Sequence, residues 1–290
     1  MILIADSGST KTNWFAIDTN GNKLFKVTTK GLNPAVFSEQ ILTDRIADNS
    51  NLMDAKNTVT TIHFYGAGCG TSTPKEILQQ VLQSIFTNAD ITIKEDTVAA
   101  VNSVTTEPAI VCILGTGSNC SYFDGNITHQ KIISLGYSVM DDASGNYYGR
   151  ILLRDYYFNK MPVDFATDFA ANHNLDADEI KKNLYKKENP NTYLANFSHY
   201  LVKHKESEYA QNVILTGIRL FIENQILQFN ESKTLPIHFI GSLAFFLQDE
   251  IRSLFEIYGL QLGKIERHPI NGLVNYHINL SSTKTSIYRK

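Results

Sequence analysis

The residues of this sequence whose types and spacing best suit chemistry lie in two short turns. Ser7-Gly8-Ser9-Thr10 follows an apolar run at Ile2–Ala5, and Thr116-Gly117-Ser118-Asn119 follows a second run at Val111–Leu114. Small side chains leave successive backbone N–H groups accessible, and the resulting concavity suits phosphate oxygens. Each turn alone is more often an ordinary hairpin turn, and neither has the GxxxxGK[ST] pattern of a P-loop. Together they predict a site that holds one phosphate chain from two sides.

Two charged residues adjoin the first turn. Asp6 ends the first apolar run, where a carboxylate is costly to bury unless it has a partner. Mg²⁺ with bound water is one such partner, and hydrogen bonds to the amides of the turn are an equally good alternative. Lys11 follows the turn and is either a phosphate contact or a solvated side chain. The residues by themselves therefore leave a metal site and a purely structural turn both open.

Strands and helices that alternate along the first half would position the first turn. The expected strands cover residues 2–5, 14–17, 23–27, 61–65 and 91–94, and the expected helices follow Pro34 and cover 74–86 and 97–104. Apolar residues recur at helical spacing in the helices and form short continuous runs in the strands. Such alternation is typical of α/β architecture.

An internal repeat divides the chain. Ile2–Thr10 aligns without gaps on Val111–Asn119, and each copy is followed by an aromatic-containing strand, a turn and a further strand. The alternative is a coincidence between two common strand-turn patterns. We expect two related domains, residues 1–106 and 107–290, each opening with a three-stranded meander that carries a glycine turn.

The second half is richer in predicted helices. They cover residues 144–159, 163–173, 176–187, 193–203, 208–229 and 244–258, with a last helix from about residue 269. Further strands are expected at 127–133, 235–240 and 260–266. The polar tail, residues 281–290, is expected to be frayed.

The two turns and several later motifs resemble the sugar-kinase, hsp70 and actin superfamily, and within it the N-acetylglucosamine kinases and the related BadF/BadG-type ATPases. The further matches follow one another in the order expected of that family: Gly31-Leu32-Asn33-Pro34, Gly66-Ala67-Gly68, Asp96 with Ala99-Ala100, Leu135-Gly136, Asp141-Asp142-Ala143-Ser144-Gly145, Phe239-Ile240-Gly241-Ser242 and Pro269-Ile270-Asn271-Gly272. The resemblance covers nearly the whole chain. It implies a duplicated actin-like ATPase fold of the ribonuclease H-like class, with ATP in a cleft between the two domains.

The resemblance also implies roles for individual residues. Asp6 would hold Mg²⁺ through water, and Gly241 and Ser242 would line the adenosine pocket. The residues that match contacts to the ATP phosphates are Ser9, Thr10, Lys11, Thr116 and Gly117. The residues that match contacts to the sugar are Asn33, Ser118, Asn119, Gly136 and Asp141.

Asp96 matches the position of the family's catalytic base. Phosphoryl transfer to a hydroxyl needs positioning, charge neutralisation and one acceptor for the hydroxyl proton. An aspartate at the N-terminus of a helix stays ionised because the helix dipole stabilises it. The residues alone favour a helix N-cap at this position, and the resemblance favours the catalytic role.

One motif departs from the family pattern. The family has Gly-Asp-Glu-Gly-Ser-Gly where this chain has Met140-Asp141-Asp142-Ala143-Ser144-Gly145. Glycine often serves conformations that other residues resist, so we expect a reshaped backbone here. The sugar pocket would then accept a different amino sugar, or activity would be lost.

Composition and charge exclude several classes of protein. The 290 residues include 26 Lys+Arg and 29 Asp+Glu, so a net charge of −3 argues against a nucleic-acid-binding protein. No apolar run approaches the roughly 20 residues that span a bilayer, and the N-terminus lacks a signal-peptide pattern. Three cysteines without CxxC spacing favour a reduced, cytoplasmic compartment, and Cys120 is predicted to be a small buried strand residue.

These observations lead to one main hypothesis and two alternatives. The main hypothesis is an ATP-dependent kinase that phosphorylates the 6-hydroxyl of N-acetylglucosamine or a related amino sugar such as N-acetylmuramic acid, working as a homodimer. One alternative is a BadF-type ATPase that activates a reductase through a bridging iron–sulfur cluster, which Cys69, Cys112 and Cys120 do not obviously serve. The other is a non-catalytic regulator that binds ATP or sugar.

Overall fold

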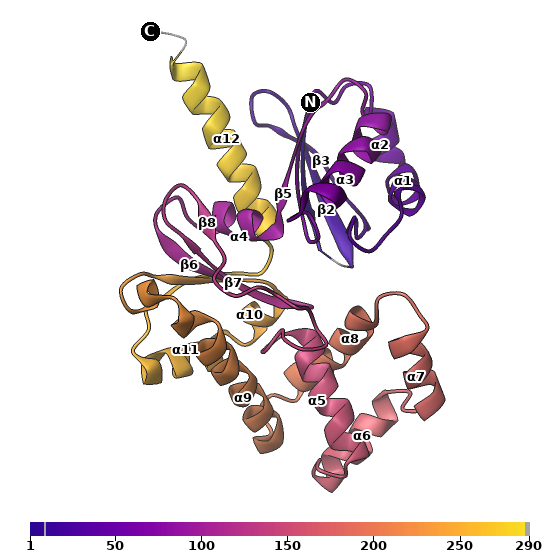
Figure 1. Ribbon diagram of the computed structural model, residues 1–290, viewed down its shortest axis with the longest axis vertical. Coiled ribbons are helices and arrows are strands. Elements are labelled where there is room, and N and C mark those ends of the chain that lie inside the picture. Colours follow the sequence, from indigo (N-terminus) through magenta and orange to yellow (C-terminus); the bar gives the residue numbers. More distant parts are fainter. Residues whose placement is uncertain (9, 288–290) are drawn as a thin grey trace. The chain divides into compact units, whose positions relative to one another are not determined.

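The computed structural model describes residues 1–8 and 10–287, and the chain forms two compact units. Unit 1 comprises Met1–Thr106 together with His268–Lys290, and unit 2 comprises Glu107–Arg267 (Figure 1). Each unit contains one five-stranded sheet covered by helices. The predicted α/β fold with duplicated actin-like domains is confirmed.

Unit 1 has its first strand at the centre of the sheet. The strand order is β3-β2-β1-β4-β5, with β1 antiparallel to β2 and parallel to β4. The elements of this unit are β1 (Ile2–Ser7), β2 (Lys11–Ile17), β3 (Lys23–Lys30), α1 (Glu39–Ala47), α2 (Ser50–Ala55), β4 (Thr61–Gly66), α3 (Ser72–Ile85), β5 (Asp90–Glu95), α4 (Asp96–Val104) and α12 (Pro269–Ile287).

Helices cover both faces of this sheet, which explains the apolar run that opens the sequence. Leu3 and Ala5 are fully buried in a core shared with α1, α2 and α3, whereas Ile4 is buried in a second core with α4 and α12. Successive strand side chains point to opposite faces, so a strand buried on both sides must be apolar at every position. The first polar residues, Asp6 and Ser7, therefore come where β1 ends.

The C-terminal helix belongs to unit 1, whereas the repeat led us to expect residues 107–290 as one domain. Gly272 of α12 packs so closely on α4 that an added Cβ would lie 2.1 Å from the carbonyl oxygen of Ser103. His277 of the same helix forms a 3.0 Å hydrogen bond through Nε2 with Tyr65 Oη. The repeat could not reveal this, because the chain returns to unit 1 only through tertiary packing.

Unit 2 repeats the same sheet with an enlarged helical layer. The strand order is β8-β7-β6-β9-β10, with β6 antiparallel to β7 and parallel to β9. The elements are β6 (Ala109–Leu114), β7 (Ser118–Phe123), β8 (Thr128–His129), α5 (Gly145–Tyr157), α6 (Val163–Asn172), α7 (Ala177–Tyr185), α8 (Pro190–Lys203), α9 (Glu208–Asn224), 3₁₀ turns at Ile226–Gln228 and Asn230–Lys233, β9 (Ile237–Ile240), α10 (Ser242–Phe246), α11 (Gln248–Tyr258) and β10 (Leu262–Glu266).

The two sheets support the duplication that the repeat suggested. In each unit the first strand lies at the centre, pairs with the second strand through a short turn, and pairs on its other side with a parallel strand. Each predicted phosphate turn consequently occupies the same place, at the carboxyl end of its central strand. This agreement of strand order and direction is difficult to attribute to a chance similarity of two nine-residue segments.

Several predicted boundaries were wrong. The strand expected over 127–133 is only the two residues of β8. The helix expected over 208–229 ends at Asn224, and a 3₁₀ turn follows at Ile226–Gln228. The helix expected over 244–258 is divided at Leu247 into α10 and α11. The tail predicted to fray is helical as far as Ile287, and residues 288–290 lie outside the described part.

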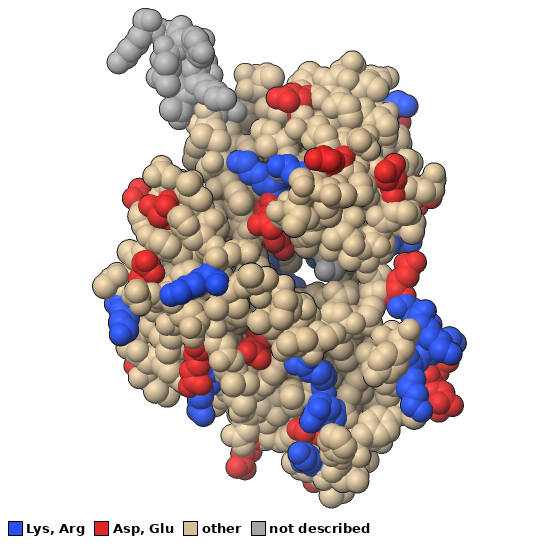
Figure 2. Space-filling view, viewed as in Figure 1, with Lys and Arg blue, Asp and Glu red and all other residues tan. Residues whose placement is uncertain are grey.

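The charged side chains visible on one face are dispersed. Figure 2 shows Lys and Arg scattered among Asp and Glu, without a broad surface of one sign. This distribution agrees with the net charge of −3 and offers no wide basic footprint on that face for a nucleic acid. Among the described residues, every helix is too short or too polar to cross a bilayer.

Candidate functional site

The first turn is fixed by its own hydroxyl groups. Ser7 is buried, and its Oγ lies 2.7 Å from Thr12 Oγ1 across the β1–β2 pair and accepts a 3.0 Å hydrogen bond from the Leu32 amide. The Gly31 amide donates to the carbonyl oxygen of Thr10 at 3.0 Å. Ser7 is thus a structural residue that ties the turn to the loop at residues 31–34. Gly8, Thr10 and Lys11 remain exposed, and Ser9 lies outside the described residues.

Two carboxylates adjoin this turn in unit 1. Burial and the charge of Asp96 raise the pKa of Asp6 to about 7, while nearby Lys11 lowers it. Burial and the charge of Glu95 raise the pKa of Asp96 to about 6, although hydrogen bonds from the Thr97 and Asp96 amides lower it in part. The structure therefore brings Lys11 and Asp96 within electrostatic reach of Asp6. Partly buried carboxylates that repel each other favour a cation or a proton between them.

Asp96 is the first residue of α4. The N-cap is Glu95, whose backbone is extended and whose side chain does not cap the helix amides. The Thr97 and Asp96 amides at the start of the helix lower the pKa of Asp96, but burial and the charge of Glu95 outweigh them. Glu95 was not identified from the sequence, and only its position next to Asp96 could have drawn attention to it.

Asn33 lies against the loop that follows β4. An added Cβ at Gly68, where φ is +79°, would lie 2.0 Å from Asn33 Oδ1. The same Oδ1 accepts a 2.9 Å hydrogen bond from the Ala35 amide, which fixes the amide side chain. The motifs Gly31–Pro34 and Gly66–Gly68 are therefore two sides of one contact within unit 1.

The second turn is closed by the start of α5. The Gly115 amide donates to the Gly117 carbonyl at 3.0 Å inside the turn. The amides of Gly145 and Asn146 donate to the carbonyls of Gly115 and Thr116 at 2.8 and 3.0 Å. These bonds use two of the amides that a helix N-terminus would otherwise offer to an anion. Any phosphate at this turn would depend on the amides of the turn itself.

Asp141 lies beside the second turn. Its Oδ2 accepts a 3.0 Å hydrogen bond from Asn146 Nδ2, and an added Cβ at Gly117 would lie 2.8 Å from the same Oδ2. Burial raises the pKa of Asp141, while Asn146 and the Ser118 amide lower it. Asn146, missed in the sequence, also accepts a 2.8 Å hydrogen bond from Ser144 Oγ. Its place one residue after the family motif was the available signal.

The side chain of Ser118, at the end of the second turn, carries a hydroxyl group that could bind a ligand. Its Oγ is buried and, among the described residues, has no hydrogen-bond partner. Asn119 follows on β7, and because strand side chains alternate, it faces the other side of the sheet from Ser118. A buried hydroxyl without a partner is unfavourable, and a polar ligand or water at this place would satisfy it.

The loop that departs from the family pattern has a left-handed backbone at two positions. Asp141 has φ of +67° and Ala143 has φ of +59°, and Ala143 is completely buried. The residue that replaces glycine thus adopts the conformation glycine would take, at a cost of about 1 kcal/mol. Asp142 Oδ2 accepts a 3.0 Å hydrogen bond from Asn224 of α9. Gly136, with φ of +80°, lies before this loop, and its carbonyl oxygen accepts a 2.9 Å hydrogen bond from the Met140 amide.

Gly241 connects the end of β9 with the second turn. Its φ is +122°, and an added Cβ would lie 2.2 Å from the carbonyl oxygen of Leu114. The Gly241 amide donates to the Glu266 carbonyl of β10 at 2.9 Å. Only glycine fits here without displacing the backbone. Unit 2 therefore gathers Thr116, Gly117, Ser118, Asp141 and Gly241 around one turn, with Ser242 beginning the short helix α10.

Comparison with solved structures identifies proteins of similar fold. The "Putative N-acetylglucosamine Kinase" from Porphyromonas gingivalis is 32% identical, with a TM-score of 0.89 over 96% of this chain and 99% of that one. A protein of the same description from Chromobacterium violaceum is 13% identical, with a TM-score of 0.77 over 95% of this chain and 98% of that one. A ROK family glucokinase from Streptomyces griseus, solved with glucose and AMPPNP, is 14% identical, with a TM-score of 0.56 over 94% and 97%. No protein-family model matches the chain, and no curated protein matches its sequence.

Proposed function

Since the chain belongs to the N-acetylglucosamine kinase and BadF/BadG-type ATPase family of actin-like proteins, we propose that it is an ATP-dependent sugar kinase acting on the 6-hydroxyl of N-acetylglucosamine or a related amino sugar. The observation that carries this proposal is the pair of glycine turns at equivalent ends of two sheets with the same strand order. Each turn has a partly buried carboxylate beside it, Asp6 in unit 1 and Asp141 in unit 2.

The exposed residues of the turns are the proposed phosphate contacts. In unit 1 these are Thr10 and Lys11, with Ser9 between Gly8 and Thr10 in the chain. In unit 2 they are Thr116 and Gly117. Their carbonyl oxygens accept hydrogen bonds from the Asn146 and Gly115 amides, and their own amides would face a ligand. Gly241 and Ser242 are the proposed adenosine contacts. Backbone amides and one lysine bind a polyanion without a basic surplus, in agreement with the net charge of −3.

Asp6 is the proposed ligand of Mg²⁺. Its raised pKa means that the ionised carboxylate is unfavourable in the protein alone, and a divalent cation would stabilise it. The described residues contain no group of three His, Cys, Asp or Glu side chains arranged to hold a metal. One carboxylate nevertheless suits Mg²⁺, which keeps several waters and takes further oxygens from phosphates. When bound, the ion would neutralise charge on the transferred phosphoryl group.

Asp96 is the proposed general base. Its pKa of about 6 keeps the carboxylate mainly ionised at neutral pH, yet makes it a stronger proton acceptor than an ordinary aspartate. It would accept the proton of the sugar hydroxyl as that oxygen attacks the γ-phosphorus. Glu95 assists because its charge contributes to the raised pKa.

The proposed sugar contacts are the polar groups that the family resemblance assigns within each unit. Asn33 is held by Ala35 in unit 1, and Ser118 and Asp141 lie at the second turn with Asn119 and Gly136 on the adjoining strand and loop. A buried hydroxyl without a partner beside a carboxylate suits a ligand rich in hydroxyl groups. The left-handed backbone at Ala143, a conformation that glycine readily adopts, favours a working pocket over a degraded one.

An ADP-release assay over a panel of sugars, with and without Mg²⁺, tests this proposal. N-Acetylglucosamine, N-acetylmannosamine, N-acetylmuramic acid and glucose would separate the amino-sugar preference from general hexose kinase activity. Mg²⁺-dependent turnover with one N-acetylated sugar is the expected result. Nucleotide binding without turnover on any sugar would instead favour a regulator, and sugar-independent ATP hydrolysis would favour an ATPase activator.

A further inference from the structure

Two thiols face each other across the strands that carry the second turn. Cys112 of β6 and Cys120 of β7 are register partners in the antiparallel pair, and their Sγ atoms lie 3.6 Å apart. Both residues are in the free thiol form. Since opposed residues of an antiparallel pair have Cα atoms about 4.5–5.5 Å apart, the pair falls within the roughly 4.4–6.8 Å range that a disulfide requires. The sulfurs need to approach to about 2.05 Å for the bond to form.

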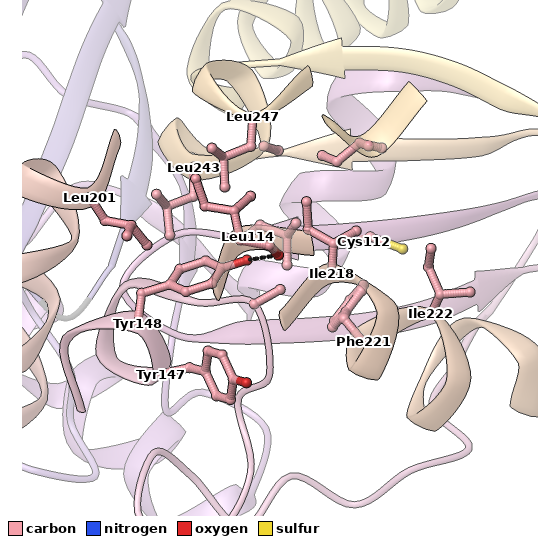
Figure 3. Close-up of a cluster of buried hydrophobic side chains, with 14 of the residues drawn as sticks. Cys112, Leu114, Tyr147, Tyr148, Leu201, Ile218, Phe221, Ile222, Leu243 and Leu247 are labelled. Carbon is pink, nitrogen blue, oxygen red and sulfur yellow. Dashed lines mark hydrogen bonds between the residues drawn. The ribbon is translucent and has the colours of Figure 1, made fainter. Parts of the chain in front are cut away.

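The pair is protected inside the core of unit 2. Cys112 and Cys120 are 0% and 1% exposed. Figure 3 shows Cys112 in one buried cluster with Leu114, Ile218 and Phe221, which belong to β6 and α9. Burial and the adjacent Cys120 thiol raise the pKa of Cys112, so little thiolate forms while the hairpin is closed. Reaction therefore requires the strand pair to open.

The sheet edge provides a route for opening. On the side away from β6, the neighbour of β7 in the sheet is the two-residue strand β8, which pairs with Tyr122 and Phe123. Between Ser118 and Ser121 the outer edge of β7 consequently has no strand partner among the described residues. Edge segments with few pairing bonds open at a lower free energy than central strands. Cys120 lies on this unpaired part of the strand.

We propose that Cys112 and Cys120 form a reversible cross-strand disulfide that regulates the second turn. Gly115, Thr116 and Gly117 connect the two strands directly. Gly115 lies three residues after Cys112, and Gly117 lies three residues before Cys120. A bond between β6 and β7 would draw the strands together next to this turn. The turn is in addition fixed to α5 by two hydrogen bonds, so it cannot relax independently.

The oxidant is a low-molecular-weight disulfide. One cysteine thiolate attacks it, forming a mixed disulfide and releasing one thiolate. The second cysteine thiolate then attacks the protein-bound sulfur, forming the Cys112–Cys120 bond and releasing the second thiolate. The two cysteines lose two protons and two electrons, and the small disulfide is reduced to two thiols. Dithiothreitol reverses the sequence.

The functional consequence rests on the proposed kinase activity, because the second turn is a proposed phosphate site. A displacement of about 1 Å in a group that positions substrate costs up to roughly 10²-fold in rate. We expect the oxidised protein to lose about 10- to 100-fold in sugar-phosphorylating turnover, and dithiothreitol to restore it.

Thiol mapping of the full chain tests the bond itself, independently of activity. The protein is treated with oxidised glutathione, blocked with an alkylating reagent under denaturing conditions and digested with trypsin. Both cysteines lie in one tryptic peptide, residues 95–131, because no Lys or Arg occurs between Lys94 and Lys131, whereas Cys69 lies in another. The expected product is this peptide lighter by two hydrogens and unalkylated, with Cys69 alkylated. Full alkylation of the peptide after oxidation, or stable glutathione on either cysteine, would overturn the proposal.

Variants separate the pair from the third cysteine. Cys112→Ala and Cys120→Ala should each abolish the intrapeptide bond and the oxidant-sensitive loss of turnover, whereas Cys69→Ser should retain the bond. Wild-type mapping decides the question even if an alanine variant folds poorly. A disulfide that forms without changing turnover would refute the regulatory role. Absence of turnover in the fully reduced protein would refute the kinase proposal instead, and the mapping would still be readable.

Discussion

The two turns share one topology but differ in their surroundings. The turn of unit 1 lies beside Asp6, whose pKa is raised by the charge of Asp96 and lowered by that of Lys11. The turn of unit 2 lies beside a single raised-pKa carboxylate, Asp141, and is otherwise held by backbone bonds from α5 and by the close approach of Gly241 to Leu114. A duplicated scaffold has thus acquired two chemistries. Unit 1 supplies titratable groups suited to proton and cation chemistry, and unit 2 supplies a shaped, mostly neutral surface.

The largest effect should follow removal of the titratable group proposed as base. Asp96→Asn keeps the shape of the side chain but removes the proton acceptor, so kcat should fall roughly 10²-fold or more while ATP binding is retained. Steady-state ADP release and equilibrium nucleotide binding measure the two effects. Asp90→Asn, an exposed change on β5 of the same unit, is the matched control. Near-wild-type turnover in Asp96→Asn would contradict the role of Asp96 as the base, and with it the proposal that unit 1 supplies the proton chemistry.

The second prediction contrasts the glycines of the two turns. An added Cβ at Gly117 would lie 2.8 Å from Asp141 Oδ2, whereas at Gly8 the nearest atom is Lys11 O at 3.9 Å. Gly117→Ala should therefore lower the thermal midpoint by several degrees, corresponding to about 1–3 kcal/mol of overpacking, while Gly8→Ala changes it little. Calorimetry of the ligand-free proteins provides the comparison. Equal destabilisation by both substitutions would show that the shape of the second turn is no more restrictive than that of the first.

The third prediction concerns pH and unit 1. Asp6 and Asp96 have pKa values raised from 3.8 to about 7 and about 6, so the folded state binds their protons more tightly than the unfolded chain does. The stability of the ligand-free protein should therefore increase as pH falls from about 8 to about 5, and decrease as pH rises through these values. Thermal midpoints of wild type and Asp6→Asn measure this. The variant should show a flatter profile, and an unchanged profile would contradict the electrostatic origin.

The same carboxyl groups predict the acid side of the activity profile. Protonation of Asp96 removes the base, so kcat should decline below about pH 6. Measurement of kcat against pH with saturating substrates gives the apparent pKa. Glu95→Gln should move that apparent pKa downward, because the charge of Glu95 helps to raise the pKa of Asp96. An unshifted profile would exclude Glu95 from this role.

The smallest effect is expected in the loop of unit 2. Ala143 has φ of +59° while completely buried, so Ala143→Gly should relieve strain and stabilise the protein by about 1 kcal/mol or less. Ala166→Gly, in the interior of α6, is the opposite control and should cost about 0.5–1 kcal/mol. Chemical denaturation of both variants measures the difference. Destabilisation of Ala143→Gly would mean that the methyl packing outweighs the backbone strain.

Local signals in the sequence were sufficient for the sheet cores and the two turns. The runs at Ile2–Ala5 and Val111–Leu114 are buried on both faces, and buried central strands are recognisable because every position must be apolar. Local sequence signals did not predict features that depend on residues far away in the chain. The break at Leu247 and the short β8 arise in segments whose local composition permits a longer element. Asn146 and Glu95 were missed because their roles depend on Asp141 and Asp96.

The sequence by itself determined the α/β class, the duplication, the positions of both turns and the family resemblance, because apolar periodicity and glycine spacing are local properties. Only the tertiary structure decided that α12 returns to unit 1, that the charge of Asp96 acts on Asp6, and that Cys112 faces Cys120 at 3.6 Å. These features depend on strand register and on close packing between segments far apart in the chain. Neither quantity is encoded in the spacing of residues along it.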